Sequence, residues 1–327
     1  MIKVGIIGFG KMGQIRALTL AESKRADIVT IYDLNPIDNP PAKVALSVDE
    51  IINDSSIDAI FICTPNYLIP EMCIKSLRAG KHVFSEKPPA LNAKQLVEVI
   101  KTEKGSSGLK LMYGFNHRHH ESIIRMKEIV GSGEMGRILW MRGRYGKEVD
   151  ESFLNGWRAN PQLSGGGIFL DQGIHMLDLF LHFGGDFDQA HSFVSNLFWK
   201  LEGVEDNVFA IYKNTSSGIC ASLHSTMTQW RYLFSLEVFL GKGALILNGL
   251  KTSSGVYGDE VLTIKKNLPK DKSGQFEQDE TFTYKSDSSW LSEINHFFDC
   301  IEKEVPINYG SSSDALKLMR LVDKTYE

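Results

Sequence analysis

A glycine-rich turn near the start of the chain restricts the fold more than any other feature. Gly8-Phe9-Gly10-Lys11-Met12-Gly13 follows an apolar run at 2–8 and opens an amphipathic stretch at 11–24. Glycine permits a tight turn and a close approach of the backbone to a pyrophosphate, and the first N–H groups of a helix favour an anion. The order strand, glycine turn, helix therefore predicts the first βαβ unit of a dinucleotide-binding domain.

The residue at the end of the second apolar run, 27–33, selects between two cofactors. This residue is Asp33, twenty positions after Gly13. A carboxylate there accepts hydrogen bonds from the ribose diol of adenosine and repels a 2′-phosphate. The spacing predicts NAD rather than NADP. The alternative is a glycine turn in a flavodoxin-like domain that binds another ligand.

The first third of the chain alternates short apolar runs with amphipathic stretches, which is typical of a parallel sheet built from βαβ units. We expect strands at 2–8, 27–33, 58–64, 81–86 and 109–115, with helices at 11–24, 69–80 and 92–105. The proline-rich segment 33–46 predicts an irregular crossover instead of a full helix. These elements predict an N-terminal Rossmann domain, a doubly wound parallel sheet, over residues 1–118.

The pattern changes after this point and predicts a second, α+β domain over residues 119–327. A helix at 120–133, a strand at 137–146 and an apolar helix at 168–183 are followed by alternating runs at 189–199, 207–226, 232–249 and 260–266. Turn residues at 214–218 and 241–243 indicate hairpins, so we expect a large, mostly antiparallel open sheet. Helices are expected at 289–304 and 312–327, the last being a candidate to pack back on the first domain.

Composition excludes several classes of protein. The 327 residues carry a net charge of −4 and no long basic run, which argues against nucleic acid as a partner. No apolar run approaches the roughly 20 residues needed to span a bilayer, and the N-terminus lacks the pattern of a secretory signal. Four widely spaced cysteines indicate neither disulfides nor a zinc site. We therefore expect a cytoplasmic protein with no membrane partner.

Two motifs leave neighbouring strands at the edge where ligands bind in α/β sheets. Thr64-Pro65-Asn66 follows one strand and offers small polar groups to the ribose of a cofactor, although turn chemistry alone also explains it. Glu86-Lys87-Pro88-Pro89 follows the next strand, and its prolines limit the backbone of Lys87 and allow a cis Lys87–Pro88 bond. A solvated Glu-Lys pair is the alternative interpretation.

A second glycine-rich segment, Ser164 to Gly167, precedes the apolar helix that carries Asp171 and His175. Residues four apart lie on one helical face, and a histidine beside a carboxylate suits a general base near neutral pH. Two alternatives remain open from the residues alone: a structural cap with a buried histidine, or a metal pair with Asp178 as third ligand.

Taken together, these motifs resemble the Gfo/Idh/MocA family of nicotinamide-dependent sugar oxidoreductases. The resemblance covers nearly the whole chain and includes "AGKHVFSEKP", "GFNHRHH", "GWR" and "GGGIFLDQGIHMLD". It implies that Lys87, Asp171 and His175 surround the reacting carbon. Two departures are Ile69, where the family often has a histidine, and the short proline-rich segment after Asp33.

The resemblance implies hydride transfer between NAD and a secondary alcohol or ketone of a sugar, polyol or nucleotide-linked sugar. His175 would be the general acid/base, Lys87 would stabilise the alkoxide, and Asp171 would orient the lysine or the substrate. The cofactor-binding candidates are Gly8, Phe9, Gly10, Lys11, Met12, Gly13, Asp33, Thr64, Pro65, Asn66, Glu86, Lys87 and Asn116. Other classes that fit the fold are an NAD-dependent glycosidase and a non-catalytic NAD-binding regulator.

The substrate-side candidates are aromatic and basic residues, one at the end of the first domain and the others in the second. A surface or packing role explains each of them equally well. They are Arg118, Trp157, Arg158, Trp230 and Arg231, and the segment 224–243 resembles members that act on nucleotide-linked sugars. The histidines in 117–120 invite a metal interpretation, but adjacent residues on a helix diverge, so we predict no metal. Family resemblance also implies a homo-dimer or homo-tetramer formed through the open sheet.

Overall fold

The computed structural model describes residues 1–252, 255–267 and 278–327. The chain divides into two compact units. The first unit contains Met1–Asn116, Gln162–Gly165 and Ser289–Arg320, and the second contains His117–Pro161, Gly166–Ser288 and Leu321–Glu327. Each unit is built around its own sheet.

The first unit contains a six-stranded parallel sheet with the strand order β3-β2-β1-β4-β5-β6. Because the order reverses direction at β1, the carboxyl ends of β1 and β4 form the switch point at which α/β sheets bind ligands. The strands are β1 (Ile2–Ile7), β2 (Ala26–Tyr32), β3 (Lys43–Val44), β4 (Ala59–Ile62), β5 (His82–Glu86) and β6 (Leu111–Gly114).

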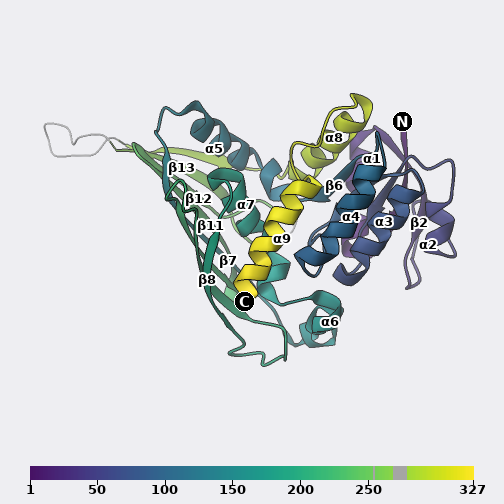
Figure 1. The fold of residues 1–327 in the computed structure, drawn as a ribbon, viewed down its shortest axis with the longest axis horizontal. Coiled ribbons are helices and arrows are strands. Elements are labelled where there is room, and N and C mark those ends of the chain that lie inside the picture. The colour runs from purple at the N-terminus through teal and green to yellow at the C-terminus, as the bar shows by residue number, and fades with distance from the viewer. Residues whose placement is uncertain (253–254, 268–277) are drawn as a thin grey trace, which may run out of the picture. The chain divides into compact units, whose positions relative to one another are not determined.

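Helices cover both faces of this sheet (Figure 1). On one face, α1 (Lys11–Ser23) packs against α8 (Ser289–Glu302), whose Phe297 and Phe298 join Phe61 and Phe84 in an aromatic core. The other face carries α2 (Val48–Ile52), α3 (Ile69–Arg78) and α4 (Ala93–Gly105). The doubly wound arrangement predicted from the alternating pattern is confirmed.

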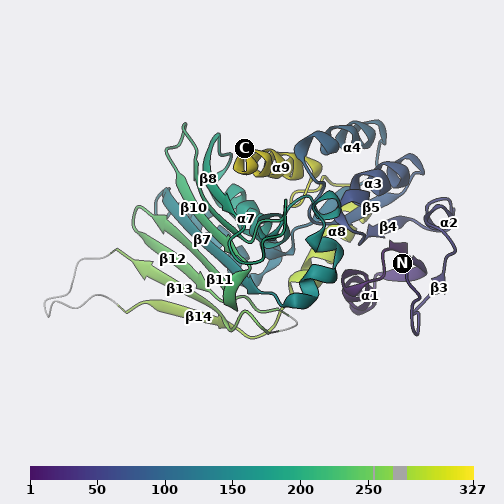
Figure 2. The same ribbon diagram turned by 90° about the horizontal axis from the view of Figure 1, so that it is seen from below.

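The second unit contains an eight-stranded sheet, whose strands Figure 2 shows side by side from β8 to β14. The order is β14-β13-β12-β11-β7-β10-β9-β8, and every pair is antiparallel except β7 with β10. The strands are β7 (Ile138–Glu148), β8 (Gln189–Ser195), β9 (Asn207–Lys213), β10 (Cys220–Thr226), β11 (Thr228–Leu240), β12 (Gly243–Asn248), β13 (Glu260–Lys266) and β14 (Glu280–Tyr284). A large, mostly antiparallel sheet was predicted and is confirmed.

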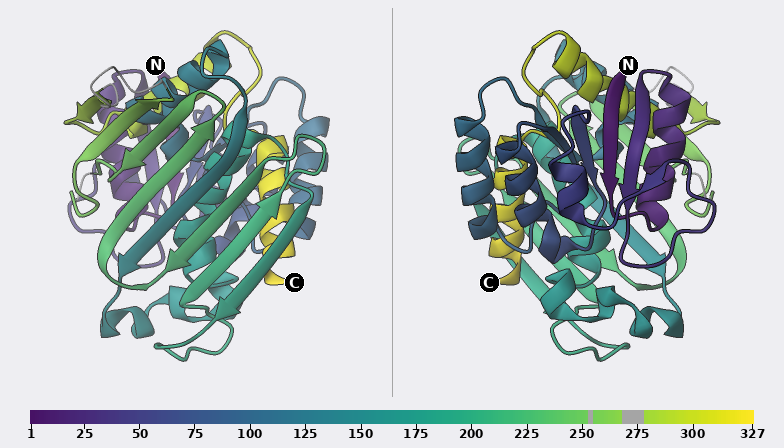
Figure 3. Two further views of the ribbon diagram at one scale, coloured as in Figure 1. Left: turned by 90° about the vertical axis from the view of Figure 1, so that its left-hand side faces the viewer. Right: turned by 90° about the vertical axis from the view of Figure 1, so that its right-hand side faces the viewer.

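Helices pack on only one face of the large sheet. Helix α7 (Ile174–Gly184) contacts β7 and β10, and α5 (Glu121–Ser132) contacts β13. In the left view of Figure 3, no described helix of the second unit lies over the opposite face. The last helix, α9 (Ser312–Tyr326), begins among residues of the first unit and ends among those of the second.

The structure differs from the sequence-based expectations in details set by local backbone chemistry. The segment 33–46 forms only the two-residue strand β3, as its prolines predict, but the short helix α2 follows it unpredicted. The helix expected over 168–183 begins as a π-helical turn, η5 (Phe169–Gly173), before α7. Strand β14 was not predicted either. In the part of the chain that is described, we find no helix with the length and apolarity of a membrane span.

Candidate active site

The first glycine turn has the shape that its sequence predicts. Gly8 has a φ of +91°, and a Cβ at Gly8 would lie 2.6 Å from the carbonyl oxygen of Cys63. A Cβ at Gly13 would lie 2.2 Å from the carbonyl oxygen of Gly8, so both positions require glycine. At Gly10, by contrast, an added Cβ meets no atom within 4 Å. The middle glycine therefore leaves open space beside the backbone.

This open space adjoins the start of α1, whose first turn contains Lys11 and Met12. No side chain caps the helix, and its first turn contains no acidic residue. The N–H groups and the positive end of the helix dipole thus remain suited to an anion. Asp33 closes the same region, because its Oδ2 accepts a hydrogen bond from the N–H of Phe9 at 2.7 Å. The turn, helix and carboxylate together fit a dinucleotide.

The motif after β4 adds two polar groups to this edge of the first unit. The hydroxyl oxygen of Thr64 is buried and has no hydrogen-bond partner in the part of the chain that is described. Asn66 is buried, and its Nδ2 donates to the carbonyl oxygen of Ser164 at 2.8 Å. Pro65 precedes the short helix η1 (Asn66–Leu68). A buried hydroxyl without a partner is the kind of group that a ligand satisfies.

At the end of β5, the Glu86 and Lys87 side chains have different surroundings. Lys87 is half-buried and precedes a cis bond to Pro88. Glu86 is buried, and its Oε1 accepts a hydrogen bond from Nε of Arg16 at 2.6 Å. Arg16 also pairs with Glu293 at 2.7 Å. Although burial opposes its charge, the two carboxylates hold the pKa of Arg16 above its ordinary value. This internal network accounts for Glu86 without a ligand.

Asn116, the last cofactor candidate of the first unit, is also buried. It begins the short helix η2 (Asn116–His119), and its Nδ2 donates to Oγ of Ser289 at 3.2 Å. The hydrogen bond ties the end of the parallel sheet to the start of α8. Asn116 therefore has a structural contact that the sequence did not reveal.

In the second unit, Glu205 organises the turn that leads to Asp171. The Glu205 carboxylate accepts hydrogen bonds from the N–H groups of Gly167 at 2.6 Å and Phe169 at 2.9 Å, and from the hydroxyl of Tyr326 at 3.0 Å. Burial raises the pKa of Glu205, while these donors oppose that shift. A Cβ at Gly167 would lie 2.0 Å from the Glu205 carbonyl oxygen, which explains the glycine.

The carboxylate of Asp171, on the π-helical turn, binds two cations of its own unit. Nζ of Lys147 on β7 lies 2.8 Å from Oδ2, and Nε of Arg158 lies 3.4 Å from Oδ1. The Arg158 guanidinium also stacks over the ring of Trp157, 4.4 Å from its centroid. Lys147 was not predicted, because it follows the strand expected at 137–146 and no motif marks it.

His175 lies one turn further along, at the start of α7, and is 5% exposed. Its ring stacks on that of His117, with centroids 3.9 Å apart and planes inclined by 13°. Nε2 of His117 in turn shares a hydrogen bond of 3.0 Å with the hydroxyl of Tyr145. The imidazole is therefore held in place by aromatic groups from η2 and β7.

Two other residues of 117–120, Arg118 and His120, pair with carboxylates. Arg118 binds both oxygens of Asp178, at 2.6 and 2.8 Å, and both side chains are buried. Nδ1 of His120 lies 2.9 Å from Oε2 of Glu260. The pairing with Arg118 occupies Asp178, which the sequence left open as a metal ligand. It also gives Arg118 a structural contact, while its predicted contact with substrate stays a prediction.

The remaining substrate-side candidates lie on an irregular part of β11. The pairing of β11 with β7 is interrupted between Thr228 and Leu233, and Trp230 has a φ of +55°. Trp230 is exposed, its ring contacts that of Phe198, and Arg231 donates to the Trp230 carbonyl oxygen. None of these contacts joins Trp230 or Arg231 to Asp171 or His175 among the described residues.

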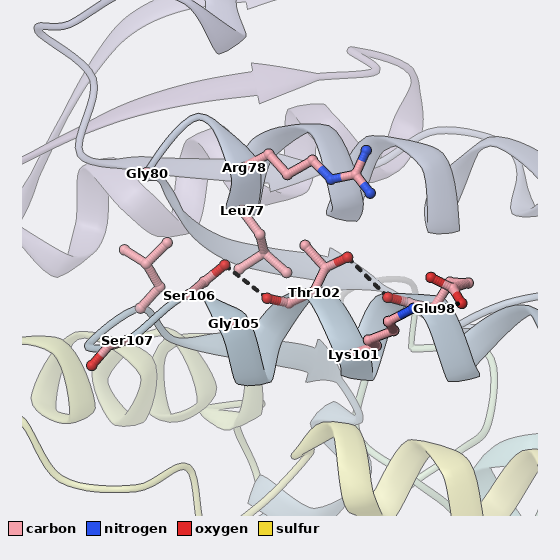
Figure 4. A pocket seen from close by; sticks show the side chains of 10 residues that line it. Leu77, Arg78, Gly80, Glu98, Lys101, Thr102, Gly105, Ser106 and Ser107 are labelled. Atoms are coloured by element: carbon pink, nitrogen blue, oxygen red, sulfur yellow. Dashed lines mark hydrogen bonds and ion pairs between the residues drawn. The ribbon is translucent and has the colours of Figure 1, made fainter.

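Figure 4 shows a surface pocket of about 650 Å³ between the last turns of α3 and α4. Arg78 and Lys101 lie on its rim, while the hydroxyls of Thr102 and Ser106 bond to helix carbonyls. Helices of βαβ units end near the amino ends of the strands. The pocket therefore lies at the sheet edge opposite to the glycine turn, and it is not the dinucleotide site.

The structure thus groups the predicted site residues by unit. The cofactor candidates and Lys87 belong to the first unit, and Asp171 and His175 lie one helical turn apart in the second. Sequence reasoning missed Lys147, Glu205 and His117 as neighbours of these two residues. Only His117 gave a signal, as part of the histidine-rich run at 117–120.

Two family models match the chain. The model described as the oxidoreductase family with an NAD-binding Rossmann fold matches residues 2–115. The model described as the GFO/IDH/MocA C-terminal domain matches residues 123–246. The two matches fall in the parallel-sheet and large-sheet regions respectively.

Several known proteins that are similar to the chain are named as enzymes that act on sugars and polyols. Myo-inositol 2-dehydrogenase of Thermotoga maritima is 27% identical over 276 residues, 79% of each protein. 1,5-Anhydro-D-fructose reductase of Ensifer adhaerens is 29% identical over 222 residues, 67% of this chain and 65% of that relative. A structure of levoglucosan dehydrogenase in complex with NADH and levoglucosan has a TM-score of 0.87 at 20% identity, covering 99% of this chain and 96% of that one.

Proposed function

Because the chain belongs to the GFO/IDH/MocA oxidoreductase family, we propose that it transfers a hydride between NAD and a secondary alcohol or ketone carbon of a sugar or polyol. The observation that carries this proposal is the glycine-bounded turn of the second unit. That glycine-rich segment leads into a helix with a carboxylate, Asp171, and a buried imidazole, His175, on consecutive helical turns. Such a pair suits proton transfer at a hydroxyl group.

The first unit supports the choice of cofactor. Gly10 leaves space for a pyrophosphate, the start of α1 is open to an anion, and Asp33 opposes a 2′-phosphate. NAD, when bound, accepts or donates the hydride. Phe9 and the other residues of the turn would hold the cofactor through their backbone. Their side chains would contribute less to cofactor binding than the backbone does.

The proton and charge chemistry is assigned to three side chains. In the direction of oxidation, the substrate C–H bond breaks with its electron pair as hydride, and His175 takes the hydroxyl proton. Lys87 donates a hydrogen bond to the alkoxide as its charge develops. Asp171 orients the substrate hydroxyl, while Lys147 and Arg158 hold the Asp171 carboxylate in place.

An uncharged sugar or polyol is the substrate class that we propose. Two similar proteins are named for myo-inositol and 1,5-anhydro-D-fructose, and a similar structure contains levoglucosan. Arg118, one candidate for a phosphate contact, forms an ion pair with Asp178. This pairing favours neutral sugars over the nucleotide-linked sugars that segment 224–243 suggested.

The test is an assay of NADH absorbance with myo-inositol, levoglucosan and 1,5-anhydro-D-fructose, the ketone being supplied with NADH. We expect net NADH formation with an alcohol or net NADH consumption with the ketone. Sugar release from glycosides without net change in NADH would instead indicate an NAD-dependent glycosidase. Tight NAD binding without turnover of any sugar would indicate a regulator, and either result would contradict the proposal.

We also propose that a second copy of the chain covers the outer face of the large sheet. This face exposes Phe193 to 82%, Ile211 to 58% and Phe209 to 52%, with Trp140 stacked on Phe239 beside them. Exposed apolar patches of this kind mark interfaces, and a self-complementary sheet face suits a symmetric dimer.

Light scattering after size exclusion tests this arrangement. The double variant Phe193→Glu/Ile211→Glu should shift the protein from oligomer to monomer. Leu46→Glu is the matched control, since Leu46 is 94% exposed and belongs to the first unit. A wild-type protein that is monomeric at micromolar concentration would refute the interface.

A further inference from the structure

Arg16, on α1, places a guanidinium in the interior of the first unit, where the residue has an exposure of 0%. Its Nε donates a hydrogen bond to Oε1 of Glu86 at 2.6 Å, and its Nη1 forms an ion pair of 2.7 Å with Oε2 of Glu293 on α8. One side chain therefore connects the helix that follows the glycine turn, the end of β5 and α8. All three elements belong to the first unit.

Arg16 contacts two residues on the same face of β5. Phe84 and Glu86 are two apart in this strand, so their side chains lie on one side of the sheet. The carbon of the guanidinium lies 4.4 Å from the ring centroid of Phe84, and 4.6 Å from that of Trp290 on α8. Lys87 is the residue that follows Glu86. The strand is thus held by a buried side chain directly before the lysine.

The neighbouring strand leaves room for this guanidinium. Gly114 on β6 pairs with Glu86 in the sheet, and a Cβ at Gly114 would lie 2.8 Å from Nη2 of Arg16. Gly114 lies in a regular strand and does not have a positive φ, so its backbone conformation is open to other residues. The volume that the guanidinium occupies explains the glycine instead.

Packing alone does not explain a charged cluster at this place. Moving a guanidinium and two carboxylates out of water is costly, and apolar residues of similar volume often give a protein equal or greater stability. A charged pair provides direction, which apolar packing lacks. The N–H groups of a planar guanidinium fix a carboxylate in both distance and angle. The Arg16–Glu86 contact is therefore suited to setting the position of the chain at the end of β5.

We propose that Arg16 is a positioning residue for Lys87: by binding Glu86 it fixes the end of β5, and with it the position of the lysine that follows. The inference rests on the proposed role of Lys87 at the alkoxide, and it adds a residue that no sequence motif singled out. Arg16 lies on the helix that begins at the glycine turn. One helix would then serve both the pyrophosphate at its start and Lys87 through its side chain.

The first test measures kcat, KM for the sugar and Kd for NAD in Arg16→Lys, with the sugar of highest turnover in the NADH assay. Lysine keeps the positive charge among the carboxylates but lacks the planar fork. Because a misplaced group costs rate, we expect kcat to fall about 10- to 100-fold. Lys87 acts on charge that develops in the transition state, so KM and Kd should stay within about two-fold of wild type.

Arg25→Lys is the matched control for this variant. Arg25 also forms ion pairs with α8, to Asp299 at 2.8 Å and Glu302 at 2.7 Å, and among the described residues its ion pairs do not include β5. The same exchange of arginine for lysine should leave kcat within about two-fold of wild type, as expected for a half-exposed pair. Equal losses of kcat in Arg16→Lys and Arg25→Lys would contradict the inference.

A second variant displaces the guanidinium without removing a charge. The methyl group of Gly114→Ala enters the space beside Nη2 of Arg16, so we expect kcat to fall about ten-fold with little change in KM. Gly105→Ala is its control, because an added Cβ at Gly105 meets no atom within 4 Å and the residue belongs to the same unit. Gly114→Ala also decides the matter if Arg16→Lys does not fold.

The decisive measurement combines these changes with Lys87→Met. A residue that acts through Lys87 has no further effect once the lysine is gone, so Arg16→Lys/Lys87→Met should be no slower than Lys87→Met alone. A merely structural role would instead slow both backgrounds by the same factor, and that result would refute the positioning role. Wild-type kcat in both Arg16→Lys and Gly114→Ala would refute it as well. Full turnover in Lys87→Met would refute the proposed role of Lys87 itself, whatever Arg16 does.

Discussion

At the scale of single residues, we propose that Asp33 lets the first unit distinguish two cofactors. Its carboxylate accepts the N–H of Phe9 at 2.7 Å and so lies against the glycine turn. A charge held there attracts a ribose diol and repels a phosphate. The spacing from Gly13 was enough to predict this residue, because turn, helix and second strand form one continuous local unit.

Asp33→Ala should therefore weaken NAD binding while leaving the chemical step nearly intact. Loss of a hydrogen bond to a charged group corresponds to roughly 10- to 100-fold in Kd. Fluorescence titration with NAD and NADP measures both affinities. Asp27→Ala, exposed at the other end of the same strand, is the control. Equal affinity of the wild-type protein for NAD and NADP would contradict the role of Asp33.

The residues that sequence reasoning missed all act over long separations in the chain. Lys147 reaches Asp171 from β7, and Glu205 reaches Gly167 from the loop before β9. Neither has a neighbour in sequence that marks its role. Pairings of this kind depend on how strands and helices pack, which periodicity and motif spacing do not encode.

At the scale of elements, the glycine-rich turn before α7 is shaped by contacts with other parts of its unit. A Cβ at Gly166 would lie 2.3 Å from the Tyr326 hydroxyl, and one at Gly167 would lie 2.0 Å from the Glu205 carbonyl. The turn leads into the π-helical segment that carries Asp171, and such segments often occur at functional sites. Sequence predicted a helix there but not the π turn, beside which Glu205 accepts hydrogen bonds from the N–H groups of Gly167 and Phe169.

Gly167→Ala should destabilise the protein because the methyl group collides with backbone that cannot move aside. Overpacking of this kind costs about 1–3 kcal/mol. Gly131→Ala is a matched control: this helical glycine has no atom within 4 Å of an added Cβ, and alanine should stabilise α5 by about 0.5–1 kcal/mol. Urea denaturation measures both. Equal stability of Gly167→Ala and wild type would exclude this explanation of the turn.

At the scale of the whole molecule, the sequence predicted both sheets. Alternation of strands and helices specifies a parallel sheet, and hairpin turns specify an antiparallel one. The parallel pairing of β7 with β10 was not predicted, since it joins strands separated by the helical segment and two further strands. Segments 162–165 and 289–304, which join the first unit, were likewise not predicted there, whereas the last helix was a candidate to pack on the first domain.

The proposed reaction requires Lys87 of the first unit and His175 of the second to act on the same substrate. The most direct measurement is a double-mutant cycle on single-turnover hydride transfer, with Lys87→Met, His175→Ala and the double variant. We expect each single change to slow transfer by about 10²–10⁴-fold. Residues that act as a unit are not additive, so the double variant should be little slower than the slower single variant. A double variant slowed by the product of the two single effects would contradict joint action of these residues.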